Sequence, residues 1–232
     1  MKSKIFSYVL RYDDGAAPNP FWGICTLTIC KPAIRRTAKI GDWVIGTGSK
    51  NSKCEDGINH DFSNHLVYAM KISKILTMSD YDIYCKQYIP EKIPDWKNRD
   101  WKKRIGDCIY DFSNGKDPNI RKSVHNEANR IKDLSGINSL LSDTFYYFGE
   151  KAIVIPQNLK KIIKRNQGHL KIENEELVFL FENWIKEFSK NKITSNPQLK
   201  HEFDKDFSEI QISNCSKRDL IEDKNEDESI IC

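Results

Sequence analysis

The sequence lacks any long hydrophobic run. None of its 232 residues lies in a stretch approaching the roughly 18 uninterrupted apolar residues of a membrane span, and the longest apolar segments carry Lys or Glu within a few positions. The start of the chain also lacks the apolar centre and small-residue cleavage site of a secretory signal. We therefore expect a cytoplasmic protein with no membrane partner.

The sequence also has few residues of the types that bind metals or form disulfide frameworks. Its seven cysteines are odd in number and widely scattered, which favours reduced thiols. Cys25 and Cys30 have no matching second pair, and none of the five histidines lie at helical i, i+4 spacing, so no metal site is expected. Gly46 to Lys50 is too short for a P-loop, and Rossmann, zinc-deaminase and Gly-x-Ser-x-Gly signatures are absent. No cofactor is predicted.

Neither basic nor acidic residues strongly predominate in the whole chain, but the two kinds are unevenly distributed along it. The chain has 37 basic and 33 acidic residues, and residues 217–232 hold three basic and six acidic ones. Residues 1–216 therefore carry 34 basic against 27 acidic side chains, a net charge of +7. A basic body suits a nucleotide or nucleic acid, although a solvated lysine-rich surface has the same composition. The acidic tail suggests the hypothesis that it folds back onto the body as a mimic of a polyanion.

Apolar spacing and turn residues predict the order of the elements. Strands are expected over 3–12, 21–30, 42–48 and 66–76, and short helices over 32–38 and 77–87. Residues 143–155 predict two strands that turn at Gly149 and Glu150. The spacing predicts a helix over 174–189, because one face of that helix would be apolar; its residues are Leu177, Leu180, Phe181, Trp184, Ile185 and Phe188.

These elements predict an α+β fold, a small mixed β-barrel with helices packed outside it. We expect a domain over residues 1–190, with an insert of about 90–122 whose sequence shows no sustained period. Residues 191–232 are expected to form a helical extension followed by an acidic, loosely ordered tail.

Several segments resemble the nucleotide modification associated domain family, type two. The likeness covers roughly residues 3–190, and it is strongest in the unbroken block 8–50. Further segments occur in the order that the family shows: Leu66–Ile72, Gly106–Tyr110, Ser123–Asn126, Phe145–Gly149, Ile155–Pro156 and Gly168–His169.

The resemblance implies a context rather than a reaction, because the family is associated with genes that modify nucleic-acid bases. The Gly41-Asp42 pair before a strand also looks like the PUA-like barrels that include the EVE and YTH readers of modified bases. The two resemblances together imply binding of a modified base, nucleotide or nucleic acid, in base modification or phage conflict.

The first candidate pocket is a proline-bounded loop. Aromatic faces and polar edges of this kind can hold a planar base, and the candidate residues are Arg11, Asp13, Asn19, Phe21 and Trp22. The alternative is a proline-rich turn stabilised by its Asp and Asn side chains, with the aromatic residues in the core.

A second set of residues would contact phosphate. Basic residues surround a predicted helix start, and hydroxyl and lysine side chains follow a strand that ends in glycines. The candidates are Lys31, Arg35, Arg36, Lys39, Thr47, Ser49 and Lys50, and Tyr147 and His169 from the family-like segments complete the predicted ligand-binding set. A solvated basic face is the alternative.

No complete catalytic constellation is recognisable in the sequence. His125, His169 and Asp13 are the candidates for proton transfer, since histidine titrates near neutrality, yet each histidine is equally compatible with a surface or structural role. A binding protein is therefore the first hypothesis. An enzyme acting on nucleotides or nucleobases, as a hydrolase or transferase, and a protein that sequesters a nucleotide signal are the alternatives.

Overall fold

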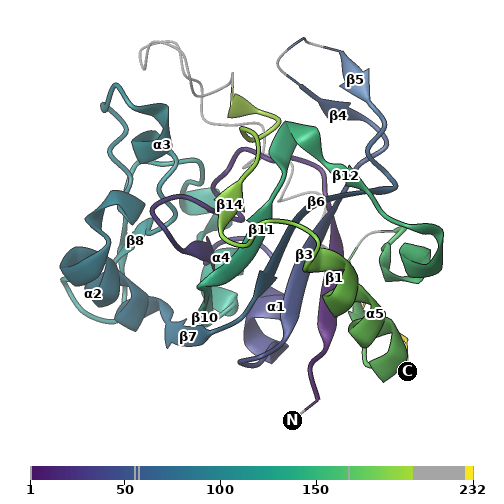
Figure 1. The fold of residues 1–232 in the computed structure, drawn as a ribbon. Helices are drawn as coiled ribbons and strands as arrows, with labels where there is room; N and C mark the ends of the chain where they lie inside the picture. Colours follow the sequence, from purple (N-terminus) through teal and green to yellow (C-terminus); the bar gives the residue numbers. More distant parts are fainter. Residues whose placement is uncertain (1, 55, 57, 167, 201–227, 232) are drawn as a thin grey trace.

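A mixed sheet of eight strands forms the centre of the fold in this computed structural model, which describes residues 2–54, 56, 58–166, 168–200 and 228–231 (Figure 1). The central strands β1 and β3 run parallel, and most other pairs are antiparallel. β12 (Ile153–Val154) pairs with β6. The hydrogen-bonded order is β14 (Lys192–Ile193), β11 (Thr144–Tyr147), β6 (His65–Lys71), β3 (Trp43–Gly48), β1 (Ile5–Leu10), β13 (His169–Ile172) and β15 (Glu228–Ile231).

A second sheet covers one face of the first. It consists of β2 (Cys25–Leu27), β10 (Asn138–Ser142) and β7 (Lys74–Thr77). The chain passes directly from β6 into β7 and from β10 into β11, so two segments contribute a strand to each sheet. A core that includes Phe6 and Tyr68 fills the space between the sheets. The mixed α and β class is confirmed, while the strand order of the described residues does not close into a barrel.

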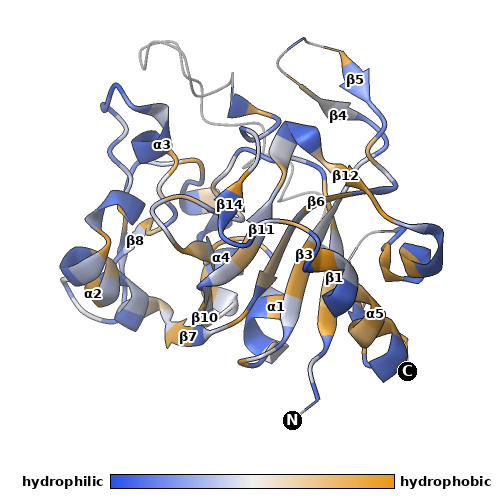
Figure 2. Ribbon diagram, viewed as in Figure 1, coloured by the Kyte–Doolittle hydropathy of each residue, from blue (hydrophilic) through white to orange (hydrophobic). Residues whose placement is uncertain are grey.

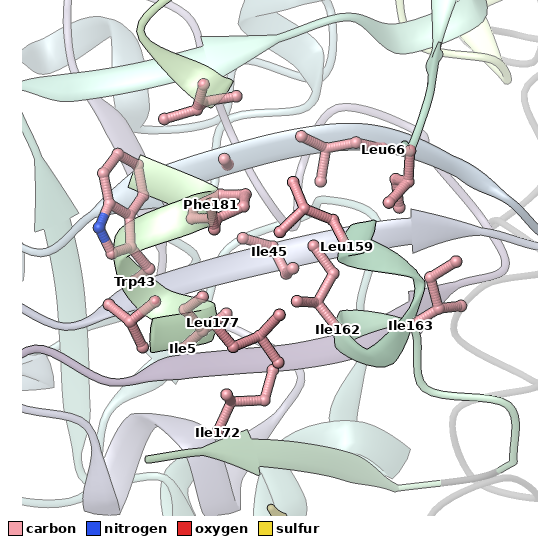
Figure 3. Packing of buried hydrophobic residues seen from close by; sticks show 14 of the residues in the cluster. Ile5, Trp43, Ile45, Leu66, Leu159, Ile162, Ile163, Ile172, Leu177 and Phe181 are labelled. Atoms are coloured by element: carbon pink, nitrogen blue, oxygen red, sulfur yellow. The ribbon is translucent and has the colours of Figure 1, made fainter. Parts of the chain in front are cut away.

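The opposite face of the main sheet is covered by α5 (Glu175–Ile185) and η4 (Gln157–Ile162). The predicted apolar stripe is confirmed, because Leu177 and Phe181 are buried against β1 and β3 (Figure 3). Much of the α5 ribbon has the orange of apolar residues in Figure 2. Asn174 caps the helix by accepting a hydrogen bond from the Leu177 N–H at 2.9 Å. The helix ends four residues before the predicted end.

The predicted basic helix is α1 (Pro32–Thr37), which begins with proline at its first position. It packs beside α4 (Arg130–Ser135) and β10. Arg35, on its buried face, donates to the carbonyl oxygens of Cys30, Asp133 and Asn138. The helix is thereby fixed to both neighbouring segments.

The region from residue 78 to 129 forms a unit of short elements beside the second sheet. Its core is rich in aromatic residues, and Phe21 packs edge-on against Trp101 with ring centroids 5.5 Å apart. The helix predicted over 77–87 is confirmed. The elements are α2 (Met78–Tyr88), η1 (Pro90–Lys92), α3 (Trp101–Arg104), β8 (Tyr110–Asp111), β9 (Asn119–Ile120) and η2 (Glu127–Asn129).

Three sequence predictions about strands are wrong. The predicted strand 66–76 is two strands, β6 and β7, which belong to different sheets. Residues 143–155 do not form a hairpin, because β11 and β12 pair in succession along the same strand β6, with η3 (Gly149–Lys151) between them. Gly149 has φ 57°, and a Cβ there would lie 2.0 Å from the Asn196 carbonyl oxygen, so its conformation and its contact both require glycine. In the predicted strand 21–30, only Cys25–Leu27 is a strand.

The remaining elements lie at the two ends of the sheet. Within the segment 49–63, β4 (Ser52–Lys53) pairs with β5 (Asn59–His60). Residues 191–200, where the sequence predicts a helical extension, contain β14 and turns, and β15 pairs in parallel with β13. The rest of the predicted acidic tail lies outside the described residues. In the part of the chain that the structure describes, no helix has the length and apolar character needed to cross a bilayer.

Candidate functional site

A basic cleft of about 720 Å³ lies where β1 and β3 end. Because the two strands are parallel neighbours, the segments that follow them leave the sheet at the same edge. Ser49 to Asn51 after β3 and Arg11 and Tyr12 after β1 line the cleft together with residues 164–166. Among the described residues that line the cleft there is no Asp or Glu, and the cationic ones are Arg11, Lys31, Lys50, Lys164 and Arg165.

Gly48 determines how closely the wall of the cleft approaches β3. A Cβ at this position would lie 2.3 Å from Phe62 Cβ and 2.6 Å from the Phe62 carbonyl oxygen, so only glycine fits. The Phe62 N–H donates to the Ser49 carbonyl oxygen at 2.9 Å. The segment that carries Ser63 is therefore held against the loop that carries Lys50.

Lys31 lies at the junction between the cleft and a second, smaller cavity. Its backbone has φ 42°, directly before Pro32, and its ammonium group lies 5.1 Å from the centroid of the Tyr8 ring. The second cavity has a volume of about 30 Å³ and shares Val9, Arg11, Tyr12 and Lys31 with the cleft. The two cavities are therefore neighbouring parts of one site.

Cys30 and His125 line this second cavity. The Cys30 sulfur lies 3.5 Å from His125 Nε2, and His125 Nδ1 lies 2.6 Å from Asp133 Oδ2. Asp133 also accepts hydrogen bonds from the Cys30 backbone N–H at 2.9 Å and from the Tyr110 hydroxyl at 3.0 Å. The structure thus assembles a thiol, an imidazole and a carboxylate from three separate segments.

The charges around His125 favour its protonated form. Burial alone lowers the pKa of the imidazole, but the charges of Asp133 and Cys30 raise it well above the ordinary histidine value. Burial raises the pKa of Asp133, and the stronger combined effect of His125 and Arg35 lowers it below the ordinary value. An ionised carboxylate beside an imidazolium is consistent with both directions.

Four predicted ligand residues line the basic cleft: Arg11, Lys31, Ser49 and Lys50. Arg11 and Lys50 are exposed, while Lys31 and Ser49 are half-buried. Of the predicted proton-transfer residues, His125 lines the second cavity. The structure therefore brings part of the base-binding set and part of the phosphate-binding set together.

The other predicted residues lie outside the linings of both cavities. Lys39 is exposed, and the side chains of the rest have structural contacts. Asp13 accepts a hydrogen bond from Tyr147, Asn19 accepts one from Lys92, and Arg36 donates to Ser135. Phe21 and Trp22 belong to the aromatic core beside the second sheet. The remaining three are Arg35 on α1, Thr47, which donates to the Tyr8 carbonyl oxygen, and His169, whose ring lies 5.9 Å from that of Phe6.

Sequence reasoning missed Lys164, Arg165, Cys30 and Asp133. The two basic residues follow a lysine-rich segment and precede Gly168, so their charge was the only available signal. Cys30 was considered only as a possible zinc ligand. Asp133 belongs to no motif, and its place beside His125 depends on the packing of α4 against α1. Within residues 2–54, 56, 58–166, 168–200 and 228–231, no three or more His, Cys, Asp or Glu side chains are grouped so that they could hold a metal ion.

The fold and the site define an α+β protein with a cationic cleft at the ends of two parallel strands. The chain belongs to the nucleotide modification associated domain 2 family, whose model matches residues 2–205. This match confirms the resemblance found in the sequence. Comparison with curated proteins gave no match, and comparison with solved structures gave none.

Proposed function

We propose that the basic cleft binds the phosphate of a nucleotide or of a nucleic acid that carries a modified base. The observation that carries this proposal is the gathering of five cationic side chains, without an acidic one, among the described residues that line a cleft of about 720 Å³. Ligand pockets commonly have volumes of about 300–1,000 Å³, so a nucleotide fits the available space. The family description supports a context of nucleotide modification.

The wall of the cleft also offers groups that suit a base. Tyr12 is half-buried in the lining, and Tyr8 contributes to the adjoining cavity beneath Lys31. Stacking of a base on an aromatic side chain contributes about 1–3 kcal/mol in single-stranded complexes. We therefore assign phosphate to the cationic side chains and the base to the region of Tyr12.

The proposal keeps a PUA-like arrangement and a cytoplasmic location. The packing of two sheets around one core, with β6–β7 and β10–β11 shared between them, supports the first. The second is supported by the free thiols of all five described cysteines, since reduced cysteines are typical of the cytoplasm. Sequestration of a nucleotide signal in phage conflict would use the same cleft.

An enzyme is the second candidate function. The observation that favours it is the convergence of Cys30, His125 and Asp133 beside the cleft. In several unrelated folds, covalent catalysis uses a nucleophile in contact with a base, and a carboxylate that orients the base.

Charge removal tests the binding proposal. We expect Arg11→Ala and Lys50→Ala each to weaken the binding of dCMP or of a fluorescent single-stranded oligodeoxynucleotide by about tenfold, because each variant removes a charge-assisted contact to phosphate. The measurement is calorimetry for dCMP and fluorescence anisotropy for the oligonucleotide. The two ligands distinguish a free nucleotide from a polymer.

Lys39→Ala is the matched control, because Lys39 is exposed and is not among the residues that line the cleft. Equal affinities for Lys39→Ala, Arg11→Ala and Lys50→Ala would contradict the proposal. Mass spectrometry of small molecules released from the purified protein by heat would identify a ligand that is retained during purification.

A further inference from the structure

We propose that Cys30 is a nucleophile that forms a covalent intermediate with a phosphate-bearing ligand held in the basic cleft, with His125 as its acid and base and Asp133 as the positioning residue. The ligand part of this inference rests on the proposed function, whereas the nucleophile itself does not.

The order of contacts is that of an activated thiol. His125 Nδ1 lies 2.6 Å from Asp133 Oδ2, so a proton on Nδ1 is donated to the carboxylate and Nε2 is directed toward the Cys30 sulfur at 3.5 Å. Asp133 Oδ1 accepts the Cys30 N–H at 2.9 Å, and the same carboxylate therefore fixes the backbone of the nucleophile. The two carboxylate oxygens of Asp133 thus position His125 and Cys30 relative to each other.

The backbone at Cys30 is unusual for a cysteine that serves only to fill a core. Cys30 has φ 58°, and Lys31 directly after it has φ 42°, so two consecutive residues other than glycine adopt the left-handed conformation. Such conformations persist where the surroundings determine them, and they concentrate at functional sites. Cys30 is 8% exposed and, although it packs against the aromatic core, it also lines the small cavity.

The other described cysteines provide the contrast. Cys25, five residues earlier, is fully buried, and burial raises the pKa of its thiol to about 12. Its sulfur faces Met70. Cys54, Cys85 and Cys108 lie outside the linings of the cleft and of the cavity, whereas Cys30 lines the cavity and has His125 beside it.

The position of the triad indicates the class of ligand. The cleft and the cavity share Arg11 and Lys31, so a phosphate bound by these cations lies next to the sulfur's cavity. The cavity volume of about 30 Å³ is small beside the roughly 300–1,000 Å³ of common ligand pockets. It accommodates a small terminal group rather than a whole base. An acyl or amidine group on the ligand fits both conditions.

The reaction balances without a redox partner. The Cys30 thiolate attacks the acyl or amidine carbon, a C–S bond forms, and the carbon–heteroatom π electrons move to the oxygen or nitrogen. When the π bond re-forms, the bond to the leaving amine or alcohol breaks, and the leaving group takes the proton of the His125 imidazolium. Neutral His125 then deprotonates a water molecule, which forms a C–O bond as the C–S bond breaks. The net reaction is hydrolysis, which regenerates the thiolate and the imidazolium.

Alkylation by iodoacetamide tests the nucleophile in the full-length protein. We expect Cys30 to be alkylated faster than Cys25, Cys54, Cys85 and Cys108, with a rate that changes little between about pH 6 and 8, because a thiolate paired with an imidazolium persists below the ordinary thiol pKa of about 8.5. Peptide mass spectrometry measures the rate at each cysteine.

In His125→Gln, we expect the rate at Cys30 to fall about tenfold for each pH unit below about 8. Cys25→Ala is the matched control and should keep the wild-type profile at Cys30. Wild type and His125→Gln share the other titratable or charged groups that surround Cys30, so a difference between their pH profiles reports on the imidazole. These groups are Tyr8, Arg11, Asp14, Lys31, Arg35, Tyr110 and Asp133.

Three results would overturn this inference. A wild-type rate at Cys30 no higher than that at Cys54 or Cys108 would assign the three side chains a purely structural role. A wild-type pH profile equal to that of His125→Gln would remove the imidazole from activation. The third concerns an alkylation-reactive protein incubated with 4-nitrophenyl acetate: the absence of an acetyl group on Cys30, together with a rate of 4-nitrophenol release no higher than that of Cys30→Ala, would remove the acyl chemistry.

The same experiment separates this inference from the proposed function. We expect dCMP or the single-stranded oligodeoxynucleotide to slow alkylation of Cys30, because the cleft and the cavity adjoin. A reactive Cys30 that neither compound protects would retain the nucleophile but contradict nucleotide binding in the cleft. Acetylation by 4-nitrophenyl acetate in wild type, and its loss in Cys30→Ala, would support the covalent step independently of either nucleic-acid probe.

Discussion

Asp13 shows how an interior position changes the chemistry of a single carboxyl group. Only 1% of its surface is exposed, the Tyr147 hydroxyl donates to Oδ1 at 2.5 Å, and the Gln198 N–H donates to Oδ2 at 3.3 Å. Burial raises the pKa of Asp13, the Tyr147 bond lowers it and the charge of Asp14 raises it further, to about 7. The folded protein therefore holds Asp13 protonated under conditions in which an unfolded chain ionises it.

This difference predicts a stability that falls as the pH rises. Between about pH 4 and 7 the folded state retains a proton that the unfolded state releases, so the free energy of unfolding decreases over this window by about 2–4 kcal/mol and is level above it. In Asp13→Asn we expect this contribution to disappear, because an amide does not titrate. Urea unfolding at a series of pH values measures the difference, and parallel curves for the two proteins would contradict the assigned pKa.

The residues of the site differ in how far the sequence reveals them. Ser49 and Lys50 were predictable because they follow a strand that ends in glycines, and Arg11 was predictable because it flanks the proline-bounded loop. Asn19 and Arg35 had equally good sequence grounds as ligand residues, but both contact distant parts of the chain instead. Asn19 accepts from Lys92, and Arg35 donates to the carbonyl oxygens of Asp133 and Asn138. The sequence gives the charge of a residue, but it does not give the distant groups that neutralise or bury that residue in the fold.

At the level of elements, a buried lysine connects the proline-bounded loop to the unit of short elements. Lys92, at the end of η1, is fully buried, and its ammonium group donates to the carbonyl oxygens of Asn19 and Ile24 and to the Thr26 hydroxyl. Thr26 in turn donates to Asp107 at 2.5 Å. Burial lowers the pKa of Lys92 below the ordinary lysine value, and the charge of Asp107 offsets only part of this effect.

Removal of this ammonium group is expected to be costly. Lys92→Ala leaves several buried acceptors without their donor and removes the positive charge that acts on the buried carboxyl of Asp107. We therefore expect the free energy of unfolding to fall by about 3–5 kcal/mol. Lys97→Ala, at an exposed position of the same region, should change it by less than about 0.5 kcal/mol. Denaturant unfolding compares the two variants, and similar midpoints would show that the network contributes little to stability.

The elements themselves were predictable where one local pattern decides the structure. The stripe from Leu177 to Ile185 and the Pro32 start of α1 suffice for two helices. The hairpin prediction for 143–155 was wrong because β11 and β12 both pair with β6, and a local pattern does not specify a partner that precedes it by many residues. The elements in the unit from 78 to 129 are short. The residues of its aromatic core therefore do not recur at regular intervals in the sequence, as those of the α5 stripe do.

At the scale of the whole molecule, charge is the property that the sequence and the structure share most directly. The basic excess of residues 1–216 was evident from composition, and the structure concentrates five of those cations around the cleft. The chain also returns to the sheet at its end, where β15 pairs with β13, the strand that begins directly after Gly168 of the cleft lining. The acidic segment 217–227 is thus joined to a strand next to the cationic site.

Neutralising that acidic segment should tighten polyanion binding. We expect the amide replacements Asp219→Asn, Glu222→Gln, Asp223→Asn, Glu226→Gln and Asp227→Asn, combined in one protein, to raise the affinity for the single-stranded oligodeoxynucleotide several-fold at low salt, because they remove negative charges that compete with phosphate for the same cations. They leave the sequence of β15 intact. Fluorescence anisotropy over a salt series measures the effect.

The salt series provides the control for this prediction. Electrostatic competition decays over about 10 Å at 0.1 M salt and about 3 Å at 1 M, so the affinities of the neutralised and wild-type proteins should converge as salt is added. Equal affinities already at low salt would contradict competition by the tail. A difference that persists at high salt would instead indicate that the replacements act through a contact other than long-range charge.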